Sequence, residues 1–212
     1  MYEVKDKVVL VTGGAAGIGA GVVQAFLEEN AKHVAALDVD VSNGQALERE
    51  MTAKYGPGKI KFYKCDVTTN DLEAAYESIL NEYGYIDVVV NNAGIMNDRP
   101  NVYLKEITIN VMEPHYSVSG VRVITLCFGC TDTTLFSLTK LGAFDKETDL
   151  LLENSLGVLP MQKPESAVKG LMDAYKTGAS ASTWLITSDK PAEDISENVK
   201  KAYSIMSQGV FS

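Results

Sequence analysis

The chain has 212 residues, of which 46% are hydrophobic and 22% are charged, and its formal net charge is −9. This length and composition can bury one sizeable core, so we expect a single domain over residues 1–190, followed by a polar, acidic tail over 191–212. The negative charge and the lack of any basic run argue against nucleic acid and anionic membrane surfaces as partners.

The first predicted strand leads directly into a glycine-rich turn. Residues 8–11 are consecutive apolar residues, which is typical of a strand buried on both faces of a parallel sheet. Gly13, Gly17 and Gly19 follow, and a helix with an apolar stripe is predicted over 18–29. Glycines at this spacing let the backbone turn sharply and approach a phosphate, while the start of the helix offers N–H groups to a pyrophosphate. The pattern therefore predicts a dinucleotide-binding turn.

A second strand is predicted over 33–37, and it leads to Asp38. A carboxylate about 20 residues after such glycines can accept hydrogen bonds from both ribose hydroxyls of an adenosine, and it would repel a 2′-phosphate. No Arg or Lys lies in the glycine loop or directly after Asp38, so the sequence favours NAD over NADP. Two alternatives stay open: Asp38 is an ordinary helix N-cap or turn residue, or Asp40 takes its place.

Four further elements continue the alternation of strands and helices through the first 90 residues. They are a helix over 42–55, a strand over 59–64, a helix over 71–83 and a strand over 86–90. Asp66 follows the third strand, where its carboxylate could bind the adenine amino group; alternatively, Asp66 or Thr68 caps the next helix. The alternation predicts an α/β fold with a Rossmann-type doubly wound parallel sheet, and ligands beyond the carboxyl ends of its strands.

Together these segments resemble the short-chain dehydrogenase/reductase family. The motifs that carry the resemblance are Thr12-Gly13-x-x-x-Gly17-Ile18-Gly19, Asp38, Cys65-Asp66-Val67 and Asn91-Asn92-Ala93-Gly94-Ile95, in the family's order and spacing. The match covers about residues 4–111 and resumes at 120–123, and Asp132-Thr133 resembles the family's segment beside the nicotinamide carboxamide, although Phe128 stands where Pro is usual.

The resemblance implies a set of functional residues. The cofactor-binding residues it implies are Gly13, Ala16, Gly17, Ile18, Gly19, Asp38, Asp66, Val67, Asn92, Ala93, Gly94 and Thr133. It also matches Asn110 to the family's active-site Asn. The implied cofactor is NAD, and the implied reaction is the NAD-dependent oxidation of a secondary alcohol to a ketone.

Between Val111 and Gly120 the chain is shorter than the family pattern by about 50 residues, enough for a strand, a crossover helix and their connections. In the family this segment bears a Ser and a Tyr-x-x-x-Lys motif, in which Tyr transfers the hydroxyl proton, Lys lowers the pKa of Tyr, and Ser positions the carbonyl oxygen. The implied strand order is 3-2-1-4-(5 missing)-6-7. We expect a strand over 121–126 to occupy the vacant place beside the fourth strand, because an unpaired apolar edge favours aggregation.

No clear replacement for the lost proton-transfer groups is found. The only Tyr-x-x-x-Lys in the chain, from Tyr55 to Lys59, spans a Gly-Pro-Gly turn at the end of the sheet away from the cofactor, so we interpret it as a coincidence. Tyr116 has Gly120 four residues on, and not Lys. His115 is a general acid/base candidate by type, but a lone His near a Pro is more often a surface residue.

After the gap, residues 135–160 take the place of the family's variable substrate lid, and their apolar side chains either contact an apolar alcohol or cover the core. A helix is predicted over 164–176 and a last strand over 183–186. Cys127 and Cys130 have C-x-x-C spacing, but zinc needs two more ligands and a redox pair needs a helix start, so we expect neither metal nor redox function. The few cysteines, the polar amino terminus and the lack of a long apolar stretch suggest a cytoplasmic location.

Three interpretations follow for the whole chain. In the first, it is an active alcohol dehydrogenase with a substitute acid/base; in the second, it is a non-catalytic NAD-binding or regulatory relative; in the third, it is a splice variant or a truncated gene model of an active enzyme. We rank the third ahead of the second and the first last, so we expect NAD(H) binding without catalysis. The missing helix resembles the one through which family members dimerise, which puts oligomer formation in doubt.

Overall fold

The structure is a computed structural model of the chain, and it describes residues 1–94, 122–134 and 159–206. The chain divides into two compact units. The amino-terminal unit comprises residues 3–113 and 132–158, and the carboxyl-terminal unit comprises residues 1–2, 114–131 and 159–212. The single domain expected over 1–190, with a tail from residue 191, stays a prediction.

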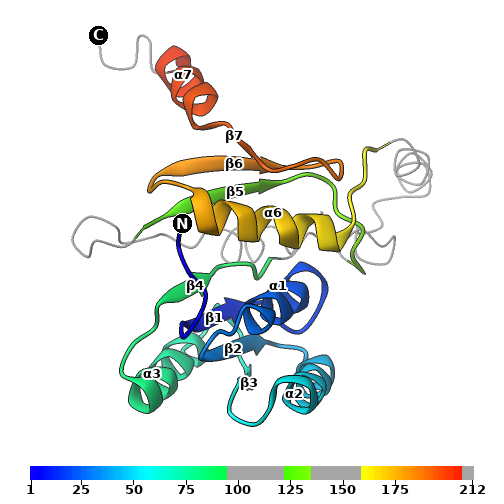
Figure 1. Ribbon diagram of the computed structural model, residues 1–212, viewed down its shortest axis with the longest axis vertical. Helices are drawn as coiled ribbons and strands as arrows, with labels where there is room; N and C mark the ends of the chain where they lie inside the picture. The colour runs from blue at the N-terminus through cyan, green and yellow to red at the C-terminus, as the bar shows by residue number, and fades with distance from the viewer. Residues whose placement is uncertain (95–121, 135–158, 207–212) are drawn as a thin grey trace. The chain divides into compact units, whose positions relative to one another are not determined.

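The amino-terminal unit contains a four-stranded parallel sheet (Figure 1). Its elements in chain order are β1 (Val8–Thr12), α1 (Gly17–Glu28), β2 (His33–Asp38), α2 (Val41–Tyr55), β3 (Ile60–Lys64), α3 (Asp71–Tyr83) and β4 (Val88–Val90). The strand order is β3-β2-β1-β4. This confirms the predicted α/β fold and its parallel sheet, and each predicted element of this unit is found within two residues of its expected ends.

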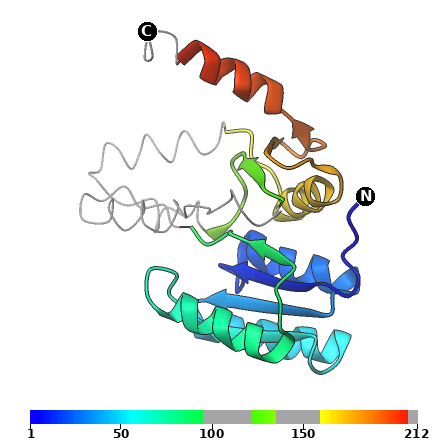
Figure 2. The same cartoon turned by 90° about the vertical axis from the view of Figure 1, so that its left-hand side faces the viewer.

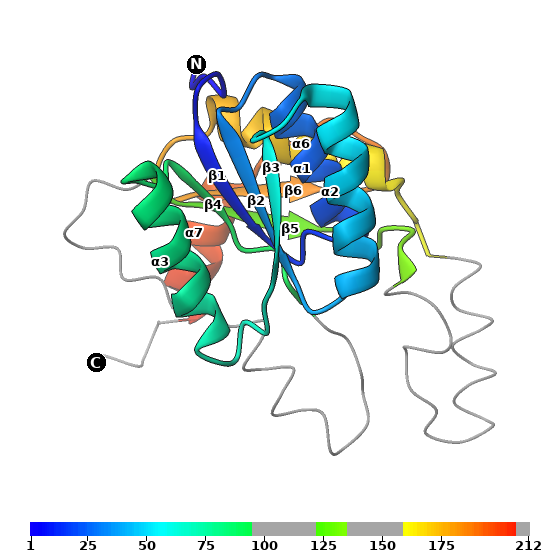
Figure 3. The ribbon, with the colours of Figure 1, turned by 90° about the horizontal axis from the view of Figure 1, so that it is seen from below.

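Helices cover both faces of this sheet: α1 and α2 lie on one face and α3 lies on the other (Figure 3). The arrangement follows from the strand order. The chain moves outward from β1 through β2 to β3 and then returns past β1 to form β4. Because parallel crossovers are right-handed, the reversal of direction places the third helix on the opposite face. The carboxyl ends of β1 and β4 are therefore neighbours at the point where the order reverses, which is where such sheets bind ligands.

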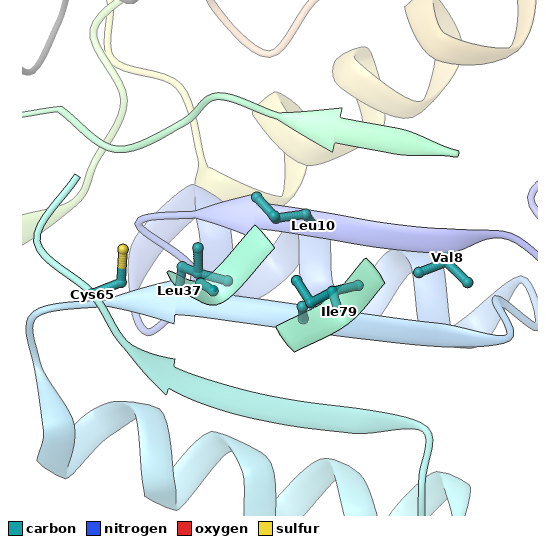
Figure 4. Close-up of a cluster of buried hydrophobic side chains, with 7 residues drawn as sticks. Val8, Leu10, Leu37, Cys65 and Ile79 are labelled. Carbon is teal, nitrogen blue, oxygen red and sulfur yellow. The ribbon is translucent and has the colours of Figure 1, made fainter. Parts of the chain in front are cut away.

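A buried apolar cluster fixes α3 against the sheet (Figure 4). Its buried members are Val8, Leu10, Ala35, Leu37, Cys65, Ala75 and Ile79. Alternate residues of β1 and β2 contribute to the cluster, because successive side chains of a strand point to opposite faces. Burial raises the pKa of the Cys65 thiol to about 11, and nearby carboxylates add to the effect. Cys65 is therefore a protonated core residue at neutral pH and not a reactive thiolate.

The carboxyl-terminal unit contains a second sheet, in the order β5-β6-β7. Its elements are β5 (Ile124–Phe128), α6 (Pro164–Thr177), β6 (Ser182–Ile186), β7 (Glu193–Asp194) and α7 (Ser196–Met206). The helix α6 lies along β5 and β6 (Figures 1 and 2). Strands β5 and β6 are parallel, whereas β7 is antiparallel to β6. None of the helices in the described ranges is long and apolar enough to cross a membrane.

The strand expected over 121–126 is found at Ile124–Phe128 and pairs with the last parallel strand, as the implied order 6-7 requires, but it does not pair with the fourth strand in the described part of the chain. Five consecutive residues of β5 pair with β6, from Ile124 opposite Ser182 to Phe128 opposite Ile186. Strands β4 and β5 therefore belong to different sheets in the described part of the chain. The length of the chain between β4 and β5 permits β5 to reach the fourth strand but does not require it. The choice of partner depends on long-range contacts, which spacing does not encode.

Gln162 ties the carboxyl ends of β5 and β6 together. Its buried side-chain Nε2 donates to Thr131 Oγ1 and to Ile186 O, both at 2.9 Å, and its backbone N donates to Cys130 O at 2.8 Å. These bonds fix the segment directly after β5. Cys127 lies within β5 and is exposed, and Cys130 is half-buried; both are free thiols. The C-x-x-C pair therefore starts within a strand and not at the start of a helix.

Candidate functional site

The turn between β1 and α1 is closely packed at its glycines. Gly13 has φ of +64° and Gly17 has φ of +55°, values that favour glycine. A Cβ on Gly19 would lie 2.0 Å from Gly13 O and 2.6 Å from Asn92 Nδ2. A Cβ on Gly13 would lie 2.9 Å from the backbone of Ala93. The first turn of α1 can therefore pack against the loop only because these positions carry no side chain.

The start of α1 carries no side-chain cap. Ala16 is the N-cap, with extended backbone (φ −150°, ψ 168°) and no side-chain hydrogen bond, and the first turn holds no acidic residue. Ala16 and Gly17 are exposed and Ile18 is half-buried. Without a side-chain cap, the first N–H groups and the positive end of the helix dipole are available to an anion.

Thr12 and Asn92 join the carboxyl ends of β1 and β4. The buried Thr12 Oγ1 accepts hydrogen bonds from Asn92 N at 3.1 Å and from Ala93 N at 3.0 Å. In return, Asn92 Nδ2 donates to the carbonyl oxygens of Thr12 and Gly13, both at 3.1 Å. Asn92 and Ala93 therefore hold the glycine loop in place, and the exposed Gly94 follows them. The sequence gives Thr12 directly before the first glycine, but its role as the acceptor that joins two strand ends was not predicted.

We expect Thr12→Val to lower the free energy of unfolding by about 2–3 kcal/mol, because it leaves two N–H groups without their acceptor. Val has nearly the same shape as Thr, so the loss reports the hydroxyl and not the packing. Thr12→Ser keeps the oxygen and removes one buried methyl, and we expect it to cost about 1 kcal/mol. Urea unfolding of the two variants measures the difference, and equal losses would contradict the assigned role.

Asp38 lies half-buried at the carboxyl end of β2, next to the glycine loop. One carboxylate oxygen accepts a hydrogen bond from Ala15 N and the other from Asp40 N, both at 3.0 Å. Asp40, in contrast, is the N-cap of α2, and its side chain accepts from Asn43 N at 3.1 Å. The N-cap alternative for Asp38 is therefore wrong, and the cap belongs to Asp40. The alternative that Asp38 is a turn residue is right in part, because its carboxylate accepts these two backbone hydrogen bonds. Each carboxylate oxygen can accept more than one hydrogen bond, so Asp38 can still accept hydrogen bonds from a ligand.

Asp66 closes a short turn after β3. Its Oδ1 accepts from Thr68 N at 3.0 Å and from Thr68 Oγ1 at 2.7 Å, and its backbone N donates to Asp71 Oδ2 at 3.2 Å. The N-cap of α3 is Asn70, without a side-chain cap bond, so the alternative that Asp66 or Thr68 caps this helix is wrong. The neighbouring Val67 is half-buried against the apolar cluster beneath α3.

Thr133 is half-buried and lies beside the start of α1, although it is far from it in the chain. A Cβ on Gly17 would lie 3.4 Å from Thr133 Cγ2. The structure thus brings Thr133 together with the glycine loop. Asn110 and the candidates His115 and Tyr116 lie outside the described residues, as do residues 135–158 of the expected lid.

The Tyr-x-x-x-Lys pair at Tyr55 and Lys59 lies away from this site. Tyr55 OH donates to Glu28 Oε1 at 3.3 Å, and Lys59 Nζ donates to Ala31 O at 3.1 Å. Ala31 precedes β2, whereas Asp38 ends it, so the pair sits at the amino end of the strand. The interpretation of this motif as a coincidence agrees with these contacts.

Comparisons with known proteins agree with this arrangement. The family model described as "short chain dehydrogenase" matches residues 7–113, so the match ends where the sequence departs from the family pattern. L-fucose dehydrogenase from Bos taurus is 45% identical over 89 residues, which cover 42% of this chain and 30% of that enzyme. 15-hydroxyprostaglandin dehydrogenase [NAD(+)] from Macaca fascicularis is 34% identical over 111 residues, which cover 52% of this chain and 41% of that enzyme. The chain thus spans less than half the length of either relative.

A solved structure shares the fold. It is a short chain dehydrogenase/reductase from Burkholderia phymatum in complex with NAD, with a TM-score of 0.66 and 13% sequence identity. The match covers 83% of this chain and 88% of that chain. At this identity the likeness concerns the fold alone.

Proposed function

Since the chain belongs to the short-chain dehydrogenase family, we propose that its amino-terminal unit binds NAD(H). The observation that carries this proposal is the packing at Gly19, where a Cβ would lie 2.0 Å from Gly13 O. Only a glycine lets the exposed, uncapped start of α1 lie so close to the loop. Further support comes from the macaque relative, whose name includes NAD(+), and from the Burkholderia structure, which holds NAD.

Different residues of this unit suit different parts of a dinucleotide. The backbone N–H groups at Ala16, Gly17 and Ile18 suit a pyrophosphate, because they begin α1 without a side-chain cap. Asp38 suits the adenosine ribose, and its negative charge disfavours the 2′-phosphate of NADP. When bound, NAD supplies the hydride acceptor of the family's reaction.

Three other groups complete the proposed site. The turn at Asp66 and Val67 suits the adenine, with the Asp66 carboxylate as acceptor for the amino group. Gly94 follows the Asn92-Ala93 turn that holds the glycine loop, and Thr133 lies beside Gly17. We assign Gly94 and Thr133 to the cofactor because both are next to the start of α1 or to the loop that precedes it.

We further propose that this chain does not catalyse the family's oxidation of a secondary alcohol. Between Val111 and Gly120 it lacks the segment that bears the family's Ser and its Tyr-x-x-x-Lys motif, and the Tyr55–Lys59 pair lies at the amino end of β2. Without a group that accepts the hydroxyl proton, hydride transfer would leave an unstabilised product. An apolar alcohol remains the substrate class that the family resemblance implies. We also propose a cytoplasmic protein that binds no nucleic acid and does not dimerise through the usual helix.

Fluorescence and absorbance measurements on the purified chain test both proposals. We expect NADH fluorescence to increase and saturate on titration with the protein, and NADPH to bind at least about tenfold more weakly, because its 2′-phosphate meets Asp38. With NAD and a panel of secondary alcohols we expect no formation of NADH. A lack of NADH binding would refute the first proposal, and turnover that is lost on replacing His115 or Tyr116 would refute the second.

A second candidate is favoured by the end of the family match at residue 113. In this alternative the native protein is an active dehydrogenase that carries the missing segment. The intact mass of the native protein decides, because about 50 further residues would add about 5 kDa to the 22.9 kDa of this chain.

A further inference from the structure

His33 lies at the opposite end of β2 from Asp38 and is almost completely buried, with 1% of its surface exposed. Its ring stacks on Tyr83, the last residue of α3, with 4.6 Å between the ring centroids and 26° between the planes. Its Nδ1 lies 2.9 Å from Gly58 O, in the turn that precedes β3. One imidazole therefore touches two segments that follow it in the chain, at the amino edge of the sheet.

The contact with Gly58 identifies the tautomer of the ring. A carbonyl oxygen can only accept, so Nδ1 carries the hydrogen and Nε2 of the neutral ring carries a lone pair. The Nε2 atom is buried and has no hydrogen-bond partner. A proton added there would create a buried charge and a donor without an acceptor, which is costly in a low-dielectric interior.

The charged groups that act on the ring are Lys61 on β3, Glu48 on α2 and Glu82 on α3. Lys32, the neighbour of His33 in the chain, lies over the rings of Tyr83 and Tyr85, and Lys59 Nζ donates to Ala31 O. Burial lowers the pKa of His33 and outweighs the Gly58 carbonyl and the two glutamates, which raise it. Glu82 is itself paired with Lys61, at 3.7 Å. Burial raises the pKa of Tyr83 to about 12, so Tyr83 stays neutral and offers no compensating charge.

We propose that His33 is an acid-sensitive latch that holds the last turn of α3 on the sheet and releases it when the ring takes up a proton. The Gly58 side does not open, because Nδ1–H donates to Gly58 O in both charge states. Instead, the last turn of α3 moves away from the ring. Tyr83 is only half-buried, and it is followed by the exposed Gly84 and by Tyr85, which is 44% exposed. Unwinding of the last turn of α3 uncovers the ring face on which Tyr83 stacks, so that water can reach the imidazole, and it breaks the bond from Gly84 N to Leu80 O.

The direction of the pH dependence follows from the lowered pKa. In the open state water reaches the ring and its pKa returns toward the ordinary value of about 6.5, whereas in the closed state burial keeps the pKa lower. Between these two values the open state binds more protons, so the stability of the closed state rises with pH. The latch is therefore fully closed above about pH 6.5, and it loosens as the pH falls through this window.

Amide hydrogen exchange of the whole chain at pH 7.5 and pH 5.5, corrected for intrinsic rates, tests the latch. We expect the Gly84 amide to lose protection severalfold at the lower pH, while the Leu10 amide in the centre of β1 does not change. His33→Phe keeps an aromatic ring against Tyr83 but cannot titrate, so it should abolish the pH-dependent loss. His33→Gln provides the same test if the Phe variant does not fold.

The chain offers a matched control, because His115 is its only other histidine. His115→Gln should retain the pH-dependent loss of protection at Gly84. The proposal is overturned if Gly84 protection does not change with pH in the wild type, if both His33 variants keep the change, or if His115→Gln removes it. None of these outcomes depends on whether the chain binds NAD(H).

Discussion

Replacing Gly19 with Ala is expected to abolish detectable NADH binding and to lower the free energy of unfolding by on the order of 3 kcal/mol. Inside a helix, Ala is normally favoured over Gly by about 1 kcal/mol. Here the added Cβ would lie 2.0 Å from Gly13 O and 2.6 Å from Asn92 Nδ2. The first of these atoms belongs to the backbone and cannot rotate away, so the steric cost exceeds the gain in helix propensity. The loop and the start of α1 must separate, and that separation removes the proposed pyrophosphate site.

Gly84→Ala is the matched control for this prediction. Gly84 has φ of +82°, but a Cβ there would meet no heavy atom within 4 Å. We expect it to cost only the left-handed backbone penalty of about 1–2 kcal/mol and to leave NADH affinity unchanged. Urea unfolding and NADH fluorescence titration measure both quantities on each variant. Wild-type NADH affinity in Gly19→Ala would show that the loop does not form the site.

Asp38→Ala is expected to weaken NADH binding by about tenfold to a hundredfold, because hydrogen bonds to a charged group contribute about 1.5–3 kcal/mol. The carboxylate at the end of β2 is the proposed acceptor for the ribose hydroxyls. The same substitution should weaken NADPH binding less than NADH binding, since it removes the negative charge that opposes a 2′-phosphate. Fluorescence titration with both dinucleotides gives the ratio of the two affinities.

Asp40→Ala separates this effect from a loss of local structure. Asp40 caps α2 through Asn43, so its replacement should cost about 1 kcal/mol of stability. It should not change the affinity for NADH. Because Asp38 also accepts from Ala15 N, Asp38→Asn is a useful second variant: it keeps an acceptor oxygen for that bond but not the charge. If Asp38→Ala and Asp40→Ala weakened NADH binding equally, the ribose assignment would be wrong.

The regular elements of the amino-terminal unit could be read from local patterns. The helix predicted over 71–83 has the same bounds in the structure, because its apolar stripe and the Gly84 that ends it are both local signals. The last strand of that unit begins later than predicted, at Val88 and not at Ile86. Asp87 explains part of the difference, since its side chain accepts the Val8 N–H at 2.8 Å, a bond that no hydrophobic pattern reveals.

The roles of single polar residues were harder to predict. Spacing alone does not distinguish Asp38 from Asp40. The hydrogen bonds do: Asp38 accepts from Ala15 N in the glycine loop, whereas Asp40 accepts from Asn43 N and caps a helix. In the sequence Thr12 is only the first residue of the glycine motif, yet its hydroxyl joins two strand ends. Asn110 lies outside the described residues, so its assignment stays a prediction.

The sequence by itself determined the fold class, the family and the glycine-rich turn, because strand and helix periodicity and glycine spacing are properties of neighbouring residues. Only the tertiary structure decided that Thr133 lies beside Gly17 and that His33 is buried against Tyr83. Each of these contacts joins residues far apart in the chain. Such contacts depend on how whole elements pack, and packing is selected by the sum of many weak interactions that no short motif contains.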